Sequence, residues 1–168
     1  GEIFLTVEEG LKMEGIKAKV TLKDVWEALR EMVHYRKILV LGSLIGCWLG
    51  IQPGGATPAS FMAYGFAKGA LGKKEEFGKG AIEGVAGPES ANNSAAQGAF
   101  IPLLTLGIPA NAVMALLLGA LIIHGIEPGP RFLISEPLPY VVFSGLLLGQ
   151  LAYVVMGPIF CKALARVI

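Results

Sequence analysis

Hydrophobic and polar positions divide the chain into an amphipathic first part and a hydrophobic remainder. Residues 1–37 mix charged and apolar side chains, and between residues 25 and 33 the apolar positions recur at helical spacing. Thr21, with Asp24 three residues later, has the pattern of a helix N-cap before this repeat. The pattern predicts a polar loop followed by an amphipathic interfacial helix that ends in the basic pair Arg36 and Lys37.

Residues 38–67 carry no charged side chain and are interrupted by the sequence QPGGATP. The first apolar half, residues 38–51, would extend about 21 Å as a helix, which is shorter than the hydrocarbon core of about 30 Å. Two interpretations are open, a single kinked span or a re-entrant hairpin with its tip at Pro53, Gly54 and Gly55. Basic residues flank both ends, and such residues prefer the cytoplasmic side. We therefore favour the hairpin.

A second interrupted segment covers residues 91–123, which are numerous enough to span a bilayer. Pro109 removes a backbone donor and crowds the preceding turn, so the segment should split into two half-helices around residues 107–109. Before it, residues 76–90 have the composition of a polar, Gly-rich connection. After it, residues 124–139 read as a loop, and residues 140–161 form an uninterrupted apolar span.

These elements together predict an all-α, polytopic membrane protein. Its membrane domain covers residues 38–168 and contains a re-entrant helical hairpin, a discontinuous transmembrane helix and one clean span. Composition agrees, because 54% of residues are apolar and 16% charged, with a mean hydropathy of +0.62, whereas soluble domains average about 45–50% and about 25%. The chain begins with Gly1 rather than Met, which suggests a part of a longer protein.

Several kinds of chemistry lack a signal in the sequence. No basic stripe with interleaved aromatic residues occurs, so nucleic-acid binding has no support. Neither histidine lies in a metal-binding pattern, and no GxSxG, HExxH or P-loop motif occurs. We therefore predict no enzyme activity, no catalytic residue, no metal and no cofactor. Cys47 and Cys161 are predicted to be buried free thiols, and the spacing Gly42, Gly46, Gly50 predicts close helix packing.

The two interruptions are the candidate binding elements. Unwound backbone at membrane depth is costly unless it lines a cavity, and transporters use half-helix N-termini for anions and freed carbonyls for cations. The alternative is a pair of structural kinks without a ligand. The predicted substrate-binding residues are Pro53, Gly54, Gly55, Thr57, Ser60, Asn92, Asn93 and Asn111. The predicted cation-binding residues are Thr105, Gly107, Ile108 and Pro109.

Two further polar features have open interpretations. The Asn92–Asn93 pair could cap a helix, or its amides could face a cavity and bind carboxylates. Glu83 and Glu89 could bind a cation or carry protons if they lie in the membrane. Their Gly-rich surroundings favour solvated helix caps instead.

The order and spacing of the motifs resemble a known family. PGGATPASFMAYGFAK is followed by FGKGAIEGV, PESANN, IPLLTLGIPAN and GIEPGP. In this respect residues 38–135 resemble the TctA family, the large permease subunit of the tripartite tricarboxylate transporters. The resemblance implies a longer, many-span protein with two similar halves, of which this chain resembles the second. It also implies the plasma (inner) membrane of a bacterium or archaeon.

The same resemblance implies partners and a transport mode. Family members work with a small membrane subunit and a periplasmic solute-binding protein. They import organic carboxylates such as citrate, by symport driven by a gradient of a coupling cation, sodium or proton. The chain departs from the family pattern at Ala110, where another glycine is usual, and at Asn111, where aspartate or serine is common. The alternative function is a non-transporting membrane scaffold or assembly subunit. A membrane-embedded enzyme is the third interpretation.

Overall fold

The computed structural model describes residues 22–71, 77–134 and 137–164, and all regular elements in these ranges are helices. The predicted all-α fold is therefore confirmed for the described residues. The chain divides into two compact units. One covers residues 30–145, and the other comprises, of the described residues, 22–29 and 146–164. Both predicted interruptions lie in the first unit, which is described first.

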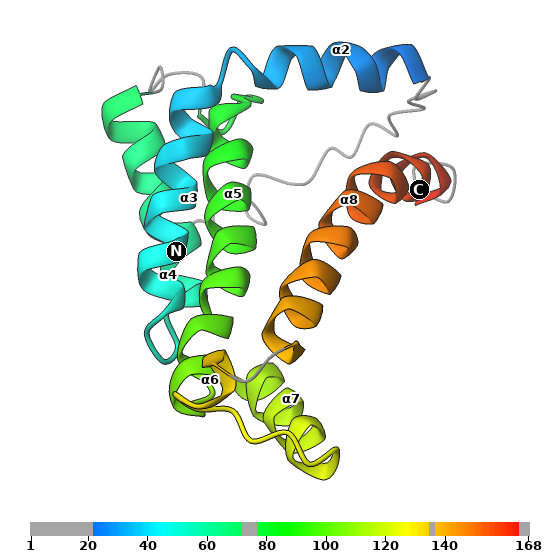
Figure 1. The fold of residues 1–168 in the computed structure, drawn as a ribbon. Coiled ribbons are helices and arrows are strands. Elements are labelled where there is room, and N and C mark those ends of the chain that lie inside the picture. Colours follow the sequence, from blue (N-terminus) through cyan, green and yellow to red (C-terminus); the bar gives the residue numbers. More distant parts are fainter. Residues whose placement is uncertain (1–21, 72–76, 135–136, 165–168) are drawn as a thin grey trace. The chain divides into compact units, whose positions relative to one another are not determined.

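Two helices form the hairpin that the sequence predicts on either side of its Pro-Gly segment. Helix α3 (Arg36–Gly50) ends before this segment, and α4 (Ala56–Phe66) begins after it. Between them Gly54 adopts the left-handed conformation (φ 74°), which glycine allows without steric cost. The chain turns back there, so α4 packs along α3 and continues into the π-helical turn η1, Ala67–Leu71 (Figure 1). The helical hairpin is present, while its re-entrant placement in a membrane stays a prediction.

Helix α5 (Glu83–Gly98) corrects the prediction for the following segment. Residues 83–90, which the sequence assigned to a polar connection, are helical, and the helix contains Pro88 in its interior. Packing explains this, because Gly87 lies against α4 and η1: a Cβ on it would stand 3.5 Å from the carbonyl oxygen of Ala63 and 3.4 Å from the Cβ of Ala67. Contacts of this kind override the low helix propensity of glycine and proline.

The interface between α3 and α5 is built from small residues. Gly42, Gly46 and Gly50 are the buried glycines of α3, and they face Ala91 and Ala95 and their neighbours on α5. A Cβ on Gly46 would overlap the carbonyl group of Ala91 and lie 2.8 Å from its Cα. Repeats of glycine at every fourth position let two helix backbones approach in this way. The predicted close packing at these glycines is confirmed.

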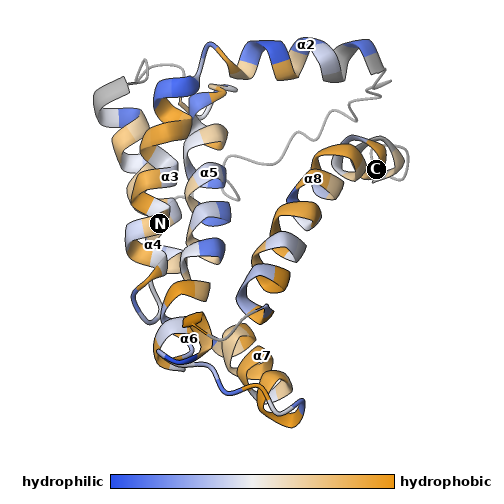
Figure 2. Ribbon diagram, in the orientation of Figure 1, coloured by the Kyte–Doolittle hydropathy of each residue, from blue (hydrophilic) through white to orange (hydrophobic). Residues whose placement is uncertain are grey.

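The second interruption also lies where the sequence predicts it. Helix α6 (Phe100–Leu106) follows α5 after the single residue Ala99, and α7 (Ala112–Ile123) begins after residues 107–111. The helical part before the break is thus longer than expected, because α5 begins at Glu83 and α6 follows it almost without a gap. Helix α7 is apolar on nearly every side, which Figure 2 shows by its colour.

The remaining elements agree with the predicted loop and last span. The short 3₁₀ helix η3 (Phe132–Ile134) lies within the predicted loop. Helix α8 (Leu138–Leu164) contains the predicted span 140–161 and Pro158. In the described part of the chain it is the one helix that by length and composition could cross a membrane, over Leu138–Phe160. Its position in a membrane, like the polytopic arrangement, stays a prediction.

Helix α2 (Leu22–Met32) matches the predicted amphipathic helix. Its apolar residues Trp26, Leu29 and Met32 are exposed, and an exposed ion pair joins Lys23 to Glu27 at 3.7 Å. Thr21 lies outside the described residues, as does the side chain of Asp24, so the N-cap prediction is not tested. The location of α2 at a membrane interface also stays a prediction.

One thiol departs from its prediction. Cys47 is free, as expected, but exposed rather than buried. It follows Gly46, which occupies the interface with α5, so the helix turns the Cys47 side chain away from that interface. The side chain of Cys161 lies outside the described residues.

Candidate functional site

The two interruptions of the hydrophobic segments meet in the structure. The backbone N–H of Gly54, at the tip of the α3–α4 hairpin, donates a hydrogen bond to the carbonyl oxygen of Ala110 at 3.0 Å. Ala110 lies between α6 and α7 and is buried. This bond brings together the predicted substrate-binding residues Pro53, Gly54 and Gly55 and the predicted residues around Pro109. Sequence reasoning proposed both interruptions, but it did not identify Ala110 as the residue that joins them.

Helix α4 begins directly beside this contact. Its N-cap is Gly55, which is buried and has no side chain to accept a hydrogen bond from the first turn. Thr57 lies in that first turn and is exposed. Because the first backbone N–H groups of a helix have no intrahelical partners, this end of α4 presents donors and the positive end of the helix dipole.

Helix α7 begins on the other side of the same contact. Asn111 is its N-cap, with an extended backbone, and its Oδ1 accepts a hydrogen bond from the Met114 N–H at 2.9 Å. The side-chain oxygen predicted to contact substrate is therefore used to cap the helix. Two helix N-termini start one residue away from the Gly54–Ala110 bond. Such termini favour anions, since both dipoles and the remaining N–H groups attract negative charge.

The residues predicted to bind a cation form the C-terminal end of α6. Gly107 is left-handed (φ 69°), its N–H donates to Leu103 at 3.0 Å, and the N–H of Ile108 donates to Pro102 at 3.2 Å. The bond from Gly107 to Leu103 is that of the αL motif, which terminates a helix at a left-handed glycine. Thr105 donates its hydroxyl to the Ile101 carbonyl at 2.6 Å. These donors are used within α6, so the segment from Thr105 to Pro109 has oxygen atoms to offer a ligand. The cation assignment stays a prediction.

A loop packs against the same break. The N–H of Gly129 donates to the Leu104 carbonyl of α6 at 3.1 Å. The carbonyl oxygen of Pro128 lies where it would be 3.1 Å from a Cβ on Gly107. The segment around residues 128–130 thus supports the end of α6. Sequence reasoning missed this contact, although the Pro-Gly-Pro motif is the visible signal for it.

The paired amides lie on α5, away from the tip. Ala91, next to Asn92, packs on Gly46, and Ala95 packs on Gly50, close to the tip. Asn92 and Asn93 precede Ala95 on the helix, so they lie about 4.5 and about 3 Å farther from the tip along the helix axis. Both are exposed, and they lie in the interior of α5 rather than at its end. The structure thus does not bring them into the contact between the two breaks.

The acidic residues of α5 occupy different positions. Glu83 is the first residue of the helix, as expected of a cap. Glu89 lies in the helix interior and is exposed, so the expectation that it caps a helix is wrong. The helix starts earlier than predicted, and this moves Glu89 from its end to its middle.

Ser60 has a structural bond. Its hydroxyl donates to the Pro88 carbonyl at 3.3 Å and so connects α4 with α5. Its side chain is half-buried. A contact with substrate would have to use the oxygen lone pairs of Ser60, and that role stays a prediction.

Comparison with known proteins identifies a matching family and two similar proteins. Residues 1–168 match the tripartite tricarboxylate transporter TctA family. An Agrobacterium vitis protein named "Uncharacterized 52.8 kDa protein in TAR-I ttuC' 3'region" is 44% identical over 159 residues, which are 93% of this chain and 31% of that protein. A second protein of that organism, "Uncharacterized protein in TAR-II ttuC' 3'region", is 53% identical over 114 residues, 67% of this chain and 47% of that protein.

The chain therefore spans less than half the length of either curated relative. No solved structure matches. The family match covers every residue of the chain, including both interruptions and α5. The chain belongs to the tripartite tricarboxylate transporter TctA family.

Proposed function

We propose that this chain is part of a multi-pass permease of the bacterial inner membrane that imports organic carboxylates. Membership of the TctA family over the whole chain carries this proposal. Transport is secondary, by symport with a cation. The permease works with the two partners that the family name implies, a small membrane subunit and a periplasmic solute-binding protein.

The paired helix N-termini supply the chemistry for a carboxylate. A bound carboxylate needs hydrogen-bond donors and a positive electrostatic potential. The first turns of α4 and α7 provide both without a charged side chain. In this proposal Gly54 and Gly55 let the substrate approach the backbone, and Thr57 adds a hydroxyl donor. Asn111 fixes the first turn of α7 through its bond to Met114.

Uptake by the full-length protein tests the proposal. The gene for the full-length permease is expressed with those of the small subunit and the binding protein in bacteria that lack carboxylate uptake. We expect saturable accumulation of radiolabelled citrate or another di- or tricarboxylate. Uptake should disappear when any one of the three components is omitted.

The scaffold alternative predicts a different result. If the three components assemble in the membrane but accumulate none of the carboxylates, the permease proposal is wrong and a non-transporting role is favoured. Assembly is measured by co-purification, so that failure to transport is not confused with failure to assemble.

A further inference from the structure

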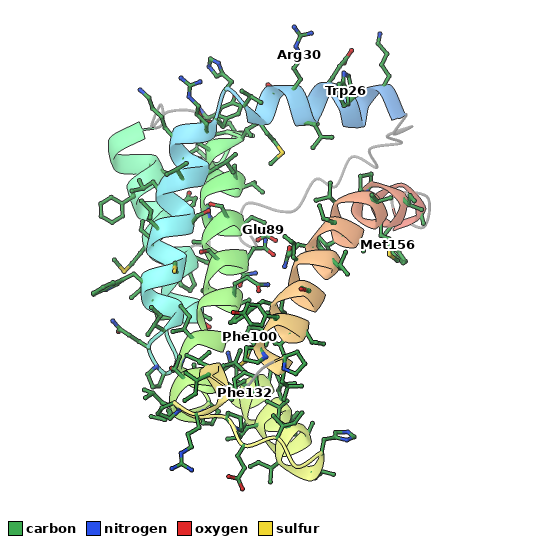
Figure 3. All side chains as sticks on the ribbon, viewed as in Figure 1. Trp26, Arg30, Glu89, Phe100, Phe132 and Met156 are labelled. Carbon is green, nitrogen blue, oxygen red and sulfur yellow. The ribbon has the colours of Figure 1, made fainter. Side chains whose placement is uncertain are left out.

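Helix α5 carries an exposed polar face that the two breaks do not use. Glu89, Asn92 and Asn93 lie at relative positions i, i+3 and i+4, which places them on one side of the helix. Figure 3 shows Glu89 on the side of α5 that faces away from α3 and α4. The opposite side of α5 is occupied by the small residues that pack on α3 and α4.

Serine hydroxyls on the packed side of α5 donate hydrogen bonds, while most polar atoms on its open side have no partner among the described residues. Ser94 donates to the Ser43 carbonyl of α3 at 2.6 Å, and Ser90 donates to the Gly87 carbonyl at 2.9 Å. Within the described part of the chain, the carboxylate of Glu89 has no ion pair and the amide of Asn92 has no hydrogen bond. The open side of α5 therefore presents unused oxygen and nitrogen atoms.

The packing of α5 on α3 determines where this polar face lies along the hairpin. Ala91 lies against Gly46, within the uncharged residues 38–51 of the hairpin. If the hairpin lies in the bilayer, as the proposed function requires, Glu89 and its neighbours lie at the same depth. An acidic side chain at the centre of a membrane helix costs about 2.5–3.5 kcal/mol by insertion scales, so such residues usually face a functional cavity.

The Asn93 side chain has a defined orientation. Its Nδ2 donates to the backbone carbonyl of Glu89 at 2.9 Å, and only a nitrogen could make that bond. The amide oxygen Oδ1 is therefore left for other partners. With the Glu89 carboxylate one turn earlier, the face presents a pair of oxygen acceptors, one of them negatively charged.

This pair suits a cation and not the carboxylate of the substrate. Hard cations such as Na⁺ bind to carboxylate and amide oxygens, whereas a substrate carboxylate would be repelled by Glu89. A proton alone would have no need of an amide oxygen one turn away.

We propose that Glu89 and Asn93 form part of the binding site for Na⁺ as the coupling ion of the permease. This inference rests on the proposed function and deepens it, and it moves Asn93 from the substrate site to the ion site. Ala91, midway between Glu89 and Asn93, packs on Gly46, about one helical turn before the end of α3 at Gly50, so cation and carboxylate occupy separate places.

Transport assays in proteoliposomes containing the full-length permease and its partners separate coupling from substrate binding. We expect Glu89→Gln to lose carboxylate accumulation driven by a Na⁺ gradient but to retain exchange of internal for external carboxylate. Asn93→Leu should raise the Na⁺ concentration for half-maximal uptake about 10–100-fold, as is typical when the support of a metal site is lost. Asn93→Asp keeps the oxygen and should restore Na⁺ dependence. Glu83→Gln, at the first residue of the same helix, is the matched control and should behave as wild type.

A binding assay that does not require transport accompanies these measurements. NaCl, compared with choline chloride, should raise the thermal unfolding temperature of the purified wild type and of Glu83→Gln, but not of Glu89→Gln or Asn93→Leu. This pattern would support the ion site even if no carboxylate were transported, in which case the proposed function alone would fail.

Three results would overturn the inference. The first is Glu89→Gln accumulating carboxylate in response to Na⁺ as well as wild type does. The second is a wild type whose uptake follows a proton gradient and ignores Na⁺. The third is the loss of both carboxylate exchange and carboxylate accumulation in all three variants, Glu89→Gln, Asn93→Leu and Asn93→Asp. This would indicate a structural or substrate-binding role.

Discussion

Gly46 of α3 lies so close to Ala91 of α5 that a methyl group on Gly46 would stand 2.8 Å from the Ala91 Cα. No flexible side chain is available to move aside, because the nearest atoms belong to the backbone. We therefore predict that Gly46→Ala forces the two helices apart. Overpacking of this kind costs about 1–3 kcal/mol.

Thermal unfolding of the purified full-length protein in detergent measures this cost. Gly65→Ala is the matched control, because Gly65 is helical and no heavy atom lies within 4 Å of the place that its added methyl group would occupy. It should be neutral or slightly stabilising, since alanine has the higher helix propensity. Equal unfolding temperatures for the two variants would contradict the close α3–α5 packing.

The N-cap of α7 gives a second prediction. Asn111→Ala removes the oxygen that accepts from the Met114 N–H, and this should lower the free energy of unfolding by about 1 kcal/mol. Asn111→Asp and Asn111→Ser keep a capping oxygen and should retain most of the stability. The same unfolding assay checks this. If all three variants lose stability equally, the capping bond is not what Asn111 contributes.

The end of α6 depends on a left-handed residue. Gly107→Ala places a Cβ where φ is 69° and where the Pro128 oxygen would be 3.1 Å away. The backbone conformation alone costs about 1–2 kcal/mol for a residue with a side chain. Gly119→Ala, in the interior of α7 with no neighbour within 4 Å, is the control. Limited proteolysis of the loop at residues 125–131 should accelerate in Gly107→Ala and remain unchanged in Gly119→Ala.

Cysteine labelling tests whether water reaches the two proposed sites. In a background of Cys47→Ala and Cys161→Ala, cysteines at Thr57 and Asn92 should react with a membrane-impermeant maleimide. Carboxylate substrate should slow the reaction at Thr57. Thr57 is preferable to Gly54, whose left-handed backbone disfavours a side chain.

Leu116 is the control for that experiment. It is 78% exposed in the chain but lies on the apolar helix α7. A cysteine there should stay unlabelled in membranes, because lipid or apolar protein covers it. Rapid labelling at Leu116 would argue against a membrane location of α7, and no labelling at Thr57 or Asn92 would argue against an aqueous path.

Local sequence signals were enough to predict most elements of this fold. The interruption at Gly107 and Pro109 was visible because glycine supplies a positive φ and proline lacks an N–H. The beginning of α5 was missed because Gly87 and Pro88 disfavour a helix locally, and their helical conformation depends on contact with α4. Local signals carry no information about such distant partners.

The candidate site shows the same limit. Each interruption could be predicted from its own residues, but the Gly54–Ala110 bond links positions far apart in the chain through backbone atoms alone. The proposed role of Asn93 depends on which of its amide atoms bonds to its own helix. Residue type alone could not distinguish a ligand for carboxylate from a ligand for a cation.

The Gly54–Ala110 bond has a consequence for how this protein can change over evolution. Both bonding atoms belong to the main chain, so the identity of Ala110 does not decide whether the bond forms. The contact accommodates the buried methyl group of Ala110. The junction therefore places no requirement on the exposed side chain of Thr57 beside it, whereas Asn111 must still cap α7. Under the proposed function, side chains around the junction can change with the substrate while the main-chain framework stays the same.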